Sequence, residues 1–356
     1  MYTHHTCHQE HFAEKCPETY IIATGSLFGI IVHRETQYSF PVGKVEIVHL
    51  FPLDFEEYLW AQDKSVWTQG IRECFGQVRP FPAHREALAL YREYLMVGGL
   101  PAAVNSWLAN NDFSELRATQ RNLAALYSAD MGMYLEDLDA SRARAIWSSI
   151  PRQLARELNK KFKLSDIQSG ARQHQFEAPF TWLVNAGLVS RHHQVTSGET
   201  PFEPRGDGSF FKAYLLDVGL LSSQMGIRPD VFLDASGYGQ IAAGFRGALT
   251  ENYVKQSLDV NEVESYYWNS GNKAEIDFLI QDACMHVVPI EVKSADNVQS
   301  KSLKVFREKY NPPLSIRLSA TNLGKANGLL TVPLYAAFCI TDSNSELDGR
   351  QFHTLR

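Results

Sequence analysis

The chain has 356 residues, 44% of them apolar and 12% aromatic, which is enough to fill the cores of two or three domains. A formal charge of -6 and an isoelectric point near 6.1 argue against an overall basic nucleic-acid-binding protein, although a local basic face fits within that balance. The five cysteines form no C-x-x-C pair, so we expect no disulfide framework. A location in the reducing cytoplasm fits this pattern. The sequence shows no apolar leader and no long apolar run, so neither secretion nor a membrane span is predicted.

The N-terminal region offers candidate ligands. The first 17 residues contain His4, His5, Cys7, His8, His11 and Cys16. These side chains could hold zinc, but their spacing matches no common finger, and a polar terminal helix is the simpler interpretation. The apolar run 20–29 then predicts a buried strand ending at Thr24-Gly25-Ser26, the kind of turn that lies near phosphates in nucleotide-binding sheets. Pro41 to Val45 is no Walker A loop, because Tyr38 and Val45 replace its Gly and Ser/Thr.

Apolar residues recur at helical spacing from residue 50 to 108, with a break at Gly98-Gly99-Leu100-Pro101. Further helices are predicted over 114–187, followed by a strand pair at 188–195 and 213–216. Three helices and a β-wing suggest a winged-helix module, a fold that often contacts DNA. Its basic residues are Arg142, Arg144, Arg152, Arg156, Lys160, Lys161, Lys163 and Arg172. They could form a phosphate-contacting face or an ordinary solvated surface.

The stretch 273–294 carries the pattern most suggestive of chemistry. Two alternating runs predict a hairpin, with Ile276, Phe278 and Ile280 on one side and Asp277 on the other. In the second run Glu291 and Lys293 alternate with apolar residues. If the runs pair, Asp277, Glu291 and Lys293 share a face where two carboxylates suffice for Mg²⁺ and the lysine assists a water or a phosphate. A surface hairpin with a cross-strand ion pair is the competing interpretation.

Helices and strands around this hairpin follow a recognisable order. A helix with Glu251 and one strand precede it, and a helix at 301–310 and a strand at 314–319 follow it. That order resembles the PD-(D/E)XK nuclease core. Ordered motifs between residues 18 and 340 extend the likeness, among them A-T-G-S-L-F-G, L-F-P-L-D-F-E-E-Y-L, Y-L-M-V-G-G-L-P, F-K-A-Y-L-L-D-V-G-L-L and P-I-E-V-K-S. The chain therefore resembles prokaryotic AAA-type ATPases that carry a C-terminal nuclease-like domain of unknown function.

The resemblance implies an α/β and α+β multidomain fold. It would combine the remnant of an AAA-type α/β ATPase core and its helical lid with a winged-helix middle and a PD-(D/E)XK nuclease-like C-terminal domain. The implied boundaries are 1–52 for the core remnant, 53–112 for the lid, 113–225 for the winged helix, 226–244 for a linker, 245–345 for the nuclease-like domain and 346–356 for a tail.

The resemblance also implies a site. It aligns Glu251, Asp277, Glu291 and Lys293 with the nuclease-like signature, so that Asp277 and Glu291 ligate Mg²⁺, Glu251 supports the metal or a water, and Lys293 assists the nucleophile or the phosphate charge. Relatives carry Walker A and B motifs before the Thr24 strand, and this sequence contains neither. We therefore expect a truncated member that does not hydrolyse ATP, unless a separate polypeptide supplies the missing loop.

Three functional interpretations follow. The first is a Mg²⁺-dependent DNA endonuclease. The second is a non-catalytic module that binds DNA or another protein through the winged-helix and nuclease-like folds. The third is a fragment whose exposed strand edge at Ile21 and Ile22 favours aggregation. The sequence indicates no membrane partner, and it determines neither the substrate nor the oligomeric state.

Overall fold

The computed structural model describes residues 22, 46–156, 161–205, 208–271, 274–294 and 301–342. Its helices are α3 (Phe55–Ala61), α4 (Ser65–Gly76), α5 (His84–Val97), α6 (Pro101–Asn110), α7 (Phe113–Tyr134), α8 (Asp137–Leu154), α9 (Gln173–Asn185), α10 (Val218–Gln224), α11 (Pro229–Leu233), α12 (Ala235–Gln240), α13 (Ala243–Val260) and α14 (Lys301–Tyr310), with short 3-10 helices η1 (Leu164–Asp166) and η2 (Leu334–Cys339). Its strands are β1 (Val189–Val195), β2 (Phe211–Leu215), β3 (Tyr266–Asn269), β4 (Glu275–Gln281), β5 (Val287–Val292), β6 (Ser315–Ser319), β7 (Gly324–Ala326) and β8 (Leu329–Pro333).

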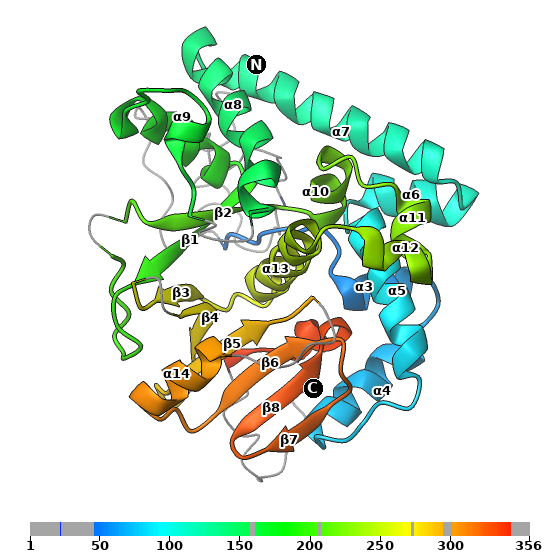
Figure 1. Cartoon of the computed structure of the whole chain (residues 1–356). Coiled ribbons are helices and arrows are strands. Elements are labelled where there is room, and N and C mark those ends of the chain that lie inside the picture. Colours follow the sequence, from blue (N-terminus) through cyan, green and yellow to red (C-terminus); the bar gives the residue numbers. More distant parts are fainter. Residues whose placement is uncertain are drawn as a thin grey trace, which may run out of the picture.

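The fold is mixed α/β and is organised around one sheet of eight strands in the order β2-β1-β3-β4-β5-β6-β8-β7. Pairings β1–β3, β5–β6 and β6–β8 are parallel, and the other pairings are antiparallel. Figure 1 shows α13 between the sheet and the group of helices α7 to α10. The strand pair, the helix at 301–310 and the strand that follows it are confirmed as β1–β2, α14 and β6.

Helix α13 lies at the centre of the molecule. All residues from Ala248 to Leu258 are buried, so this helix is covered on every side rather than along one stripe. Its buried amides are satisfied by hydrogen bonds. Asn252 accepts from the Leu215 backbone N–H at 2.9 Å and donates to the Leu215 carbonyl at 3.0 Å, and Gln256 accepts from the Val218 N–H at 3.1 Å. These bonds fix β2 and α10 against α13.

The expected wing does not form a sheet of its own. Helices α7, α8 and α9 precede the β1–β2 hairpin in the anticipated order, but β1 also pairs in parallel with β3 through Gln194↔Tyr267 and Val195↔Trp268. A single cluster of buried apolar side chains runs from Phe55 to Ile340. The regions expected as a winged helix and as a nuclease-like domain therefore share one sheet and one main core, which the alternation within each strand could not reveal.

The stretch expected as a linker, 226–244, contains the short helices α11 and α12. Phe232 is buried, and its ring lies 5.0 Å from that of Tyr238. Its glycines suggested an open connection, yet apolar side chains hold it against the body of the protein.

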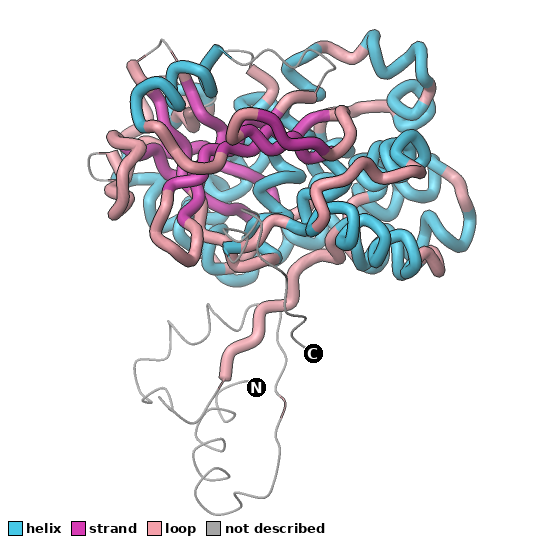
Figure 2. Tube along the Cα trace, turned by 90° about the horizontal axis from the view of Figure 1, so that it is seen from below, coloured by secondary structure: helices cyan, strands magenta, loops and turns pink. Residues whose placement is uncertain are grey.

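Figure 2 shows the strands flanked by helices, with residues 46–50 running away from the body. The Thr24-Gly25-Ser26 turn, the histidine-rich start and the Pro41 to Val45 loop lie outside the described residues.

The Gly98-Gly99 turn packs against the backbone of Leu53 and the side chain of Asp217. Gly99 donates its N–H to Asp217 Oδ2 at 2.7 Å, and Leu53 donates its N–H to the Gly99 carbonyl at 2.8 Å. Asp217 is buried, and burial raises the pKa of its carboxyl to about 6. A Cβ at Gly99 would lie 1.8 Å from the Leu53 carbonyl oxygen, so no side chain fits there. This close approach explains why glycines stand between α5 and α6.

We expect Gly99→Ala to destabilise the fold by about 1–3 kcal/mol, because the added methyl group must displace backbone rather than a flexible side chain. The measurement is chemical denaturation followed by circular dichroism. Gly239→Ala is the matched control, since Gly239 lies in α12 with no heavy atom within 4 Å of the added Cβ. Equal stability of the two variants would contradict the proposed close packing.

Candidate active site

The structure brings the four expected site residues together from different elements. Glu251 lies in α13, Asp277 in β4 and Glu291 in β5, and Lys293 directly follows β5. The charges of Glu251 and Glu291 both act on the Asp277 carboxyl, and all three carboxyl groups act on Lys293. Pairing of β4 with β5 and packing of α13 therefore gather these groups into one electrostatic cluster.

Asp277 lies just beyond the point where the pairing of β4 with β5 ends. Their ladder runs from Gln281↔Val287 to Phe278↔Ile290, and beyond it the Val292 backbone N–H donates to Asp277 Oδ2 at 2.8 Å. The Asp277 carboxylate thus satisfies a backbone donor that the ladder leaves free. This bond holds the β4 carboxylate beside the Glu291 end of β5.

One detail of the predicted alternation is wrong. Ile276 was expected on the same side as Phe278 and Ile280, but it packs with Leu279 in a separate small cluster, whereas Phe278 and Ile280 lie in the main core. The cause is an irregularity in the β3–β4 pairing, where Tyr266↔Leu279 is followed by Trp268↔Ile276 and β4 gains one extra residue. Such a bulge re-aims nearby side chains, and it lies next to Asp277.

The Asp277 carboxyl has an unusually high pKa. Burial, together with the negative charges of Glu251 and Glu291, raises its pKa to about 8. The Lys212 charge and the Val292 hydrogen bond act in the opposite direction but do not outweigh them. At neutral pH the group therefore holds a proton for most of the time, and a cation placed near it would favour its ionised form.

Glu291 has one free acceptor. Its Oε1 forms an ion pair with Lys293, while its buried Oε2 has no hydrogen-bond partner among the described residues. Burial opposes the charge of Lys293, but Glu291, Asp277 and Glu251 outweigh it and raise the lysine pKa. An unpartnered, buried carboxylate oxygen costs free energy, and such a cost is expected where a ligand completes the site.

Lys212 is a site residue that the sequence analysis missed. It comes from β2, its side chain is fully buried, and its Nζ lies 2.6 Å from Glu275 Oε1 and 3.6 Å from Glu251 Oε2. Tyr214, two residues further on, donates its hydroxyl to Glu251 Oε2 at 3.3 Å. Burial alone disfavours the Lys212 ammonium, but the nearby carboxylates hold its pKa well above the ordinary value. Lysine inside the otherwise apolar strand F-K-A-Y-L was the signal that could have identified it.

His192 was also missed, and it positions the backbone of Asp277. It is completely buried in β1, with Nε2 2.9 Å from the Asp277 carbonyl oxygen and Nδ1 3.5 Å from Ser265 Oγ. Burial, with the Lys255 charge, lowers its pKa well below the usual value. The ring is therefore neutral, and Nε2–H donates to Asp277. The wing hairpin thus contributes two residues to a site that the sequence analysis assigned to the C-terminal domain alone.

The cluster offers carboxylate oxygens, the type of ligand that a hard divalent cation prefers. It contains four carboxyl groups, those of Glu251, Glu275, Asp277 and Glu291, and two ammonium groups. When all are ionised, two negative charges remain in excess. The three carboxylates Glu251, Asp277 and Glu291 do not close into one set with ligand atoms within 4.8 Å of each other. Because Glu251 contacts Lys212 and Tyr214, Asp277 and Glu291 are the better direct ligands for Mg²⁺, which keeps several waters.

The raised pKa of Asp277 predicts that the stability of the fold depends on pH. Between its unfolded pKa near 4 and its folded pKa of about 8, the folded state binds the extra proton. Stability should therefore fall as pH rises through this range, by at most about 1.4 kcal/mol per pH unit from this group, and level off above pH 8. The measurement is denaturation in EDTA from pH 5 to pH 9. Asp277→Asn should flatten the curve relative to the parent, and parallel curves would contradict the assignment.

The basic residues of the middle module are largely engaged within it. Arg142 Nη1 donates to Asp139 at 3.1 Å, Arg144 Nε donates to the Ser128 carbonyl at 3.0 Å, and Arg156 pairs with Asp166. Lys160 lies outside the described residues. These ion pairs are only partly buried, and the expected DNA-contacting face stays a prediction.

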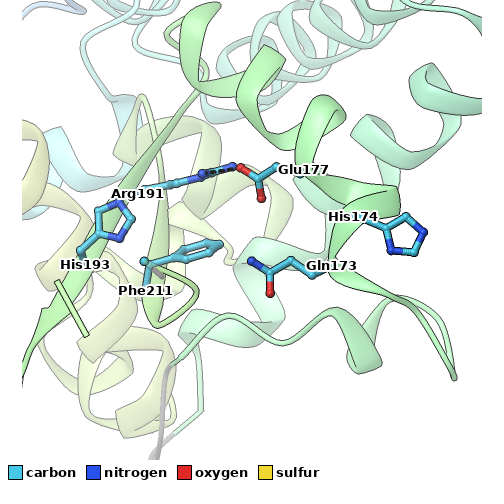
Figure 3. A pocket seen from close by; sticks show the side chains of 7 residues that line it. Gln173, His174, Glu177, Arg191, His193 and Phe211 are labelled. Atoms are coloured by element: carbon cyan, nitrogen blue, oxygen red, sulfur yellow. Dashed lines mark ion pairs between the residues drawn. The ribbon is translucent and has the colours of Figure 1, made fainter. Parts of the chain in front are cut away.

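A cavity of about 510 Å³ lies between α9 and the β1–β2 hairpin. Figure 3 shows Arg191 and Glu177 pointing toward each other across it, and their charged atoms lie 2.9 Å apart. The Arg191 guanidinium also stacks over Phe180 and Phe211, at 4.5 and 5.3 Å from the ring centroids. Glu177 compensates the charge of Arg191, while Arg191 Nε and Nη2 are buried without a hydrogen-bond partner among the described residues.

Fold and site together define a mixed α/β protein with an acidic, lysine-containing cluster where two strands of its sheet separate. None of the described helices combines the length and apolar character needed to cross a bilayer. Comparison with protein families finds two matches. Residues 88–231 match a family described as Domain of unknown function (DUF8612), and residues 246–336 match Domain of unknown function (DUF4143).

DUF4143 is found in proteins associated with AAA-type ATPases, which agrees with the kinship part of the resemblance. The acidic cluster draws on both matched regions, because Lys212 and His192 lie in the first and Glu251 to Lys293 lie in the second. No curated protein and no solved structure matches the chain.

Proposed function

We propose that this protein is a metal-dependent phosphodiesterase of the nuclease type that acts on DNA. The observation that carries the proposal is the buried carboxylate cluster, in which the pKa of Asp277 is raised to about 8 and Glu291 Oε2 has no hydrogen-bond partner among the described residues. A site with unbalanced negative charge and a free carboxylate oxygen is suited to a hard divalent cation.

In this proposal each residue has a distinct role. Asp277 and Glu291 would hold Mg²⁺, which would supply Lewis acidity toward a phosphate and a water. Lys293, paired with Glu291, places its ammonium beside the site and stabilises negative charge that develops on the phosphate. Glu251 and Lys212 set the local charge, and His192 fixes the main chain of Asp277.

The test is cleavage of linear and supercoiled DNA by the full chain with Mg²⁺ or Mn²⁺, and with EDTA as a blank. Lys293→Ala should abolish metal-dependent cleavage without changing the circular dichroism spectrum, because it removes the charge beside the phosphate. Lys304→Ala, which truncates an exposed lysine on α14, is the control and should behave as wild type. Cleavage that survives EDTA, or that is equal in the Lys293 variant, would refute the proposal.

A second candidate is a non-catalytic module that binds DNA or a protein partner. Lys212 favours it, because a buried ammonium already compensates part of the negative charge. This candidate predicts binding without turnover, with a steep salt dependence through the Arg142 to Arg172 region. If charge reversal of several of these arginines causes no loss of DNA binding, DNA binding through the Arg142 to Arg172 region is excluded.

We also propose the AAA-type kinship and a cytoplasmic location. The ordered sequence motifs and the DUF4143 match support the kinship. The location rests on five cysteines without a C-x-x-C pair, and Cys74, Cys284 and Cys339 form no disulfide in the described part of the chain.

A further inference from the structure

The turn that joins β4 to β5 carries a second set of candidate metal ligands. Its sequence is D-A-C-M-H, residues 282–286, and it follows directly on the Gln281↔Val287 pair. One ligand atom from each of Asp282, Cys284 and His286 lies within 4.8 Å of the other two. Among the described residues, no other group of three or more His, Cys, Asp or Glu side chains meets this condition.

The backbone of this turn is held in place. Asp282 Oδ1 accepts the N–H groups of Cys284 and His286, each at 2.8 Å, and the Asp282 N–H donates to the His286 carbonyl at 3.0 Å. Met285 adopts a left-handed conformation with φ of 66°. Since the main chain is fixed by these contacts, the thiol of Cys284 and the ring of His286 are presented together before any ligand arrives.

The burial pattern suits an open metal site. Asp282 is buried, whereas Cys284 and His286 are exposed, so an ion can enter from solvent. His286 Nδ1 lies 3.2 Å from Asp282 Oδ2. Ligands around tetrahedral zinc are about 3.3–3.8 Å apart, given bonds of about 2.0–2.3 Å, so a small rotation of exposed side chains is enough.

The type of ligand selects the metal. The hydrogen bonds of Asp282 account for the shape of the turn. That shape requires neither the thiol of Cys284 nor the imidazole of His286. Thiolate, imidazole and carboxylate together favour zinc or a similar transition metal over Mg²⁺, which prefers oxygen ligands only. Asp282 is five residues along the chain from Asp277, about 16 Å in a strand, so the site is separate from the carboxylate cluster.

We propose that the β4–β5 turn binds one zinc ion through Asp282, Cys284 and His286, with water completing the coordination. The site does not depend on the proposed function. It also differs from the histidine-rich first 17 residues, which lie outside the described residues and need to be controlled for in any experiment.

The experiment uses the full chain with Cys7→Ser and Cys16→Ser as the parent. Zn²⁺ binding is measured by competition with a chromogenic chelator, and Co²⁺ serves as the spectroscopic probe. The parent should show a thiolate-to-cobalt charge-transfer band. Cys284→Ser should abolish this band and remove one equivalent of tightly bound zinc, and His286→Gln should weaken that equivalent at least tenfold. Cys74 and Cys339 are buried and should not contribute.

Met285→Leu is the matched control, because Met285 is an exposed residue of the same turn that provides none of the three ligands. It should bind zinc and cobalt as the parent does, and all variants should give the parent circular dichroism spectrum. The proposal is overturned if Cys284→Ser and His286→Gln bind zinc as tightly and in the same number as the parent, or if the parent gives no thiolate band with Co²⁺.

Discussion

Glu291→Gln is expected to lower Mg²⁺-dependent DNA cleavage at least about 100-fold, because even groups one step removed from a metal cost 10–100-fold when replaced. The amide retains the shape of the side chain but loses the charge that would hold the cation. The same change should alter the stability of the metal-free fold by less than about 1 kcal/mol, because it removes a buried, unpartnered carboxylate oxygen together with the ion pair to the partly exposed Lys293. Loss of activity without loss of stability is the signature of a functional group.

The measurement pairs cleavage rates across a Mg²⁺ titration with melting curves in EDTA. Glu308→Gln is the control, because Glu308 lies on the exposed face of α14 and pairs only weakly with Lys304 at 3.7 Å. It should match wild type in both assays. If Glu291→Gln cleaves DNA at the wild-type rate, Glu291 is not a metal ligand and the phosphodiesterase proposal loses its central residue.

Lys212→Met is expected to destabilise the metal-free protein by about 3–5 kcal/mol, the range found when one partner of a buried ion pair is removed. Lys212 is fully buried against Glu251 and Glu275, and methionine fills a similar volume without the charge. The loss therefore comes from carboxylates left without a counter-charge. Chemical denaturation in EDTA measures it, and Lys304→Met, which alters an exposed lysine, should change stability by less than about 0.5 kcal/mol.

Two further arms connect this stability effect to the site. In Lys212→Met, Mg²⁺ should raise the melting temperature more than it does in wild type, because the cation replaces the missing positive charge. Adding Glu251→Gln should restore part of the lost stability by removing one uncompensated carboxylate. A Lys212→Met protein as stable as wild type, or one indifferent to both changes, would show that the ammonium does not balance this cluster.

The local parts of the site followed from sequence. Alternation in 273–294 predicted the hairpin, helical spacing predicted α13 and α14, and residue type singled out Asp277, Glu291 and Lys293. Each of these depends on neighbours within a few residues along the chain, where periodicity is informative. The side of Ile276 was mispredicted because one extra residue in β4 shifts the alternation, and a bulge leaves no reliable trace in a single sequence.

By itself, the sequence determined the β1–β2 pair, the β4–β5 hairpin, helices α13 and α14 and strand β6, the absence of a Walker A pattern, and the acid and lysine residues of the last third. Only the tertiary structure decided that β1 pairs with β3, which carries Lys212 and His192 from the wing into the carboxylate cluster. Strand pairing across more than 70 residues depends on how the whole core packs, and burial of a charge depends on what surrounds it from every side. Neither property is encoded in the neighbouring residues of a strand, so both emerge only when the chain is folded.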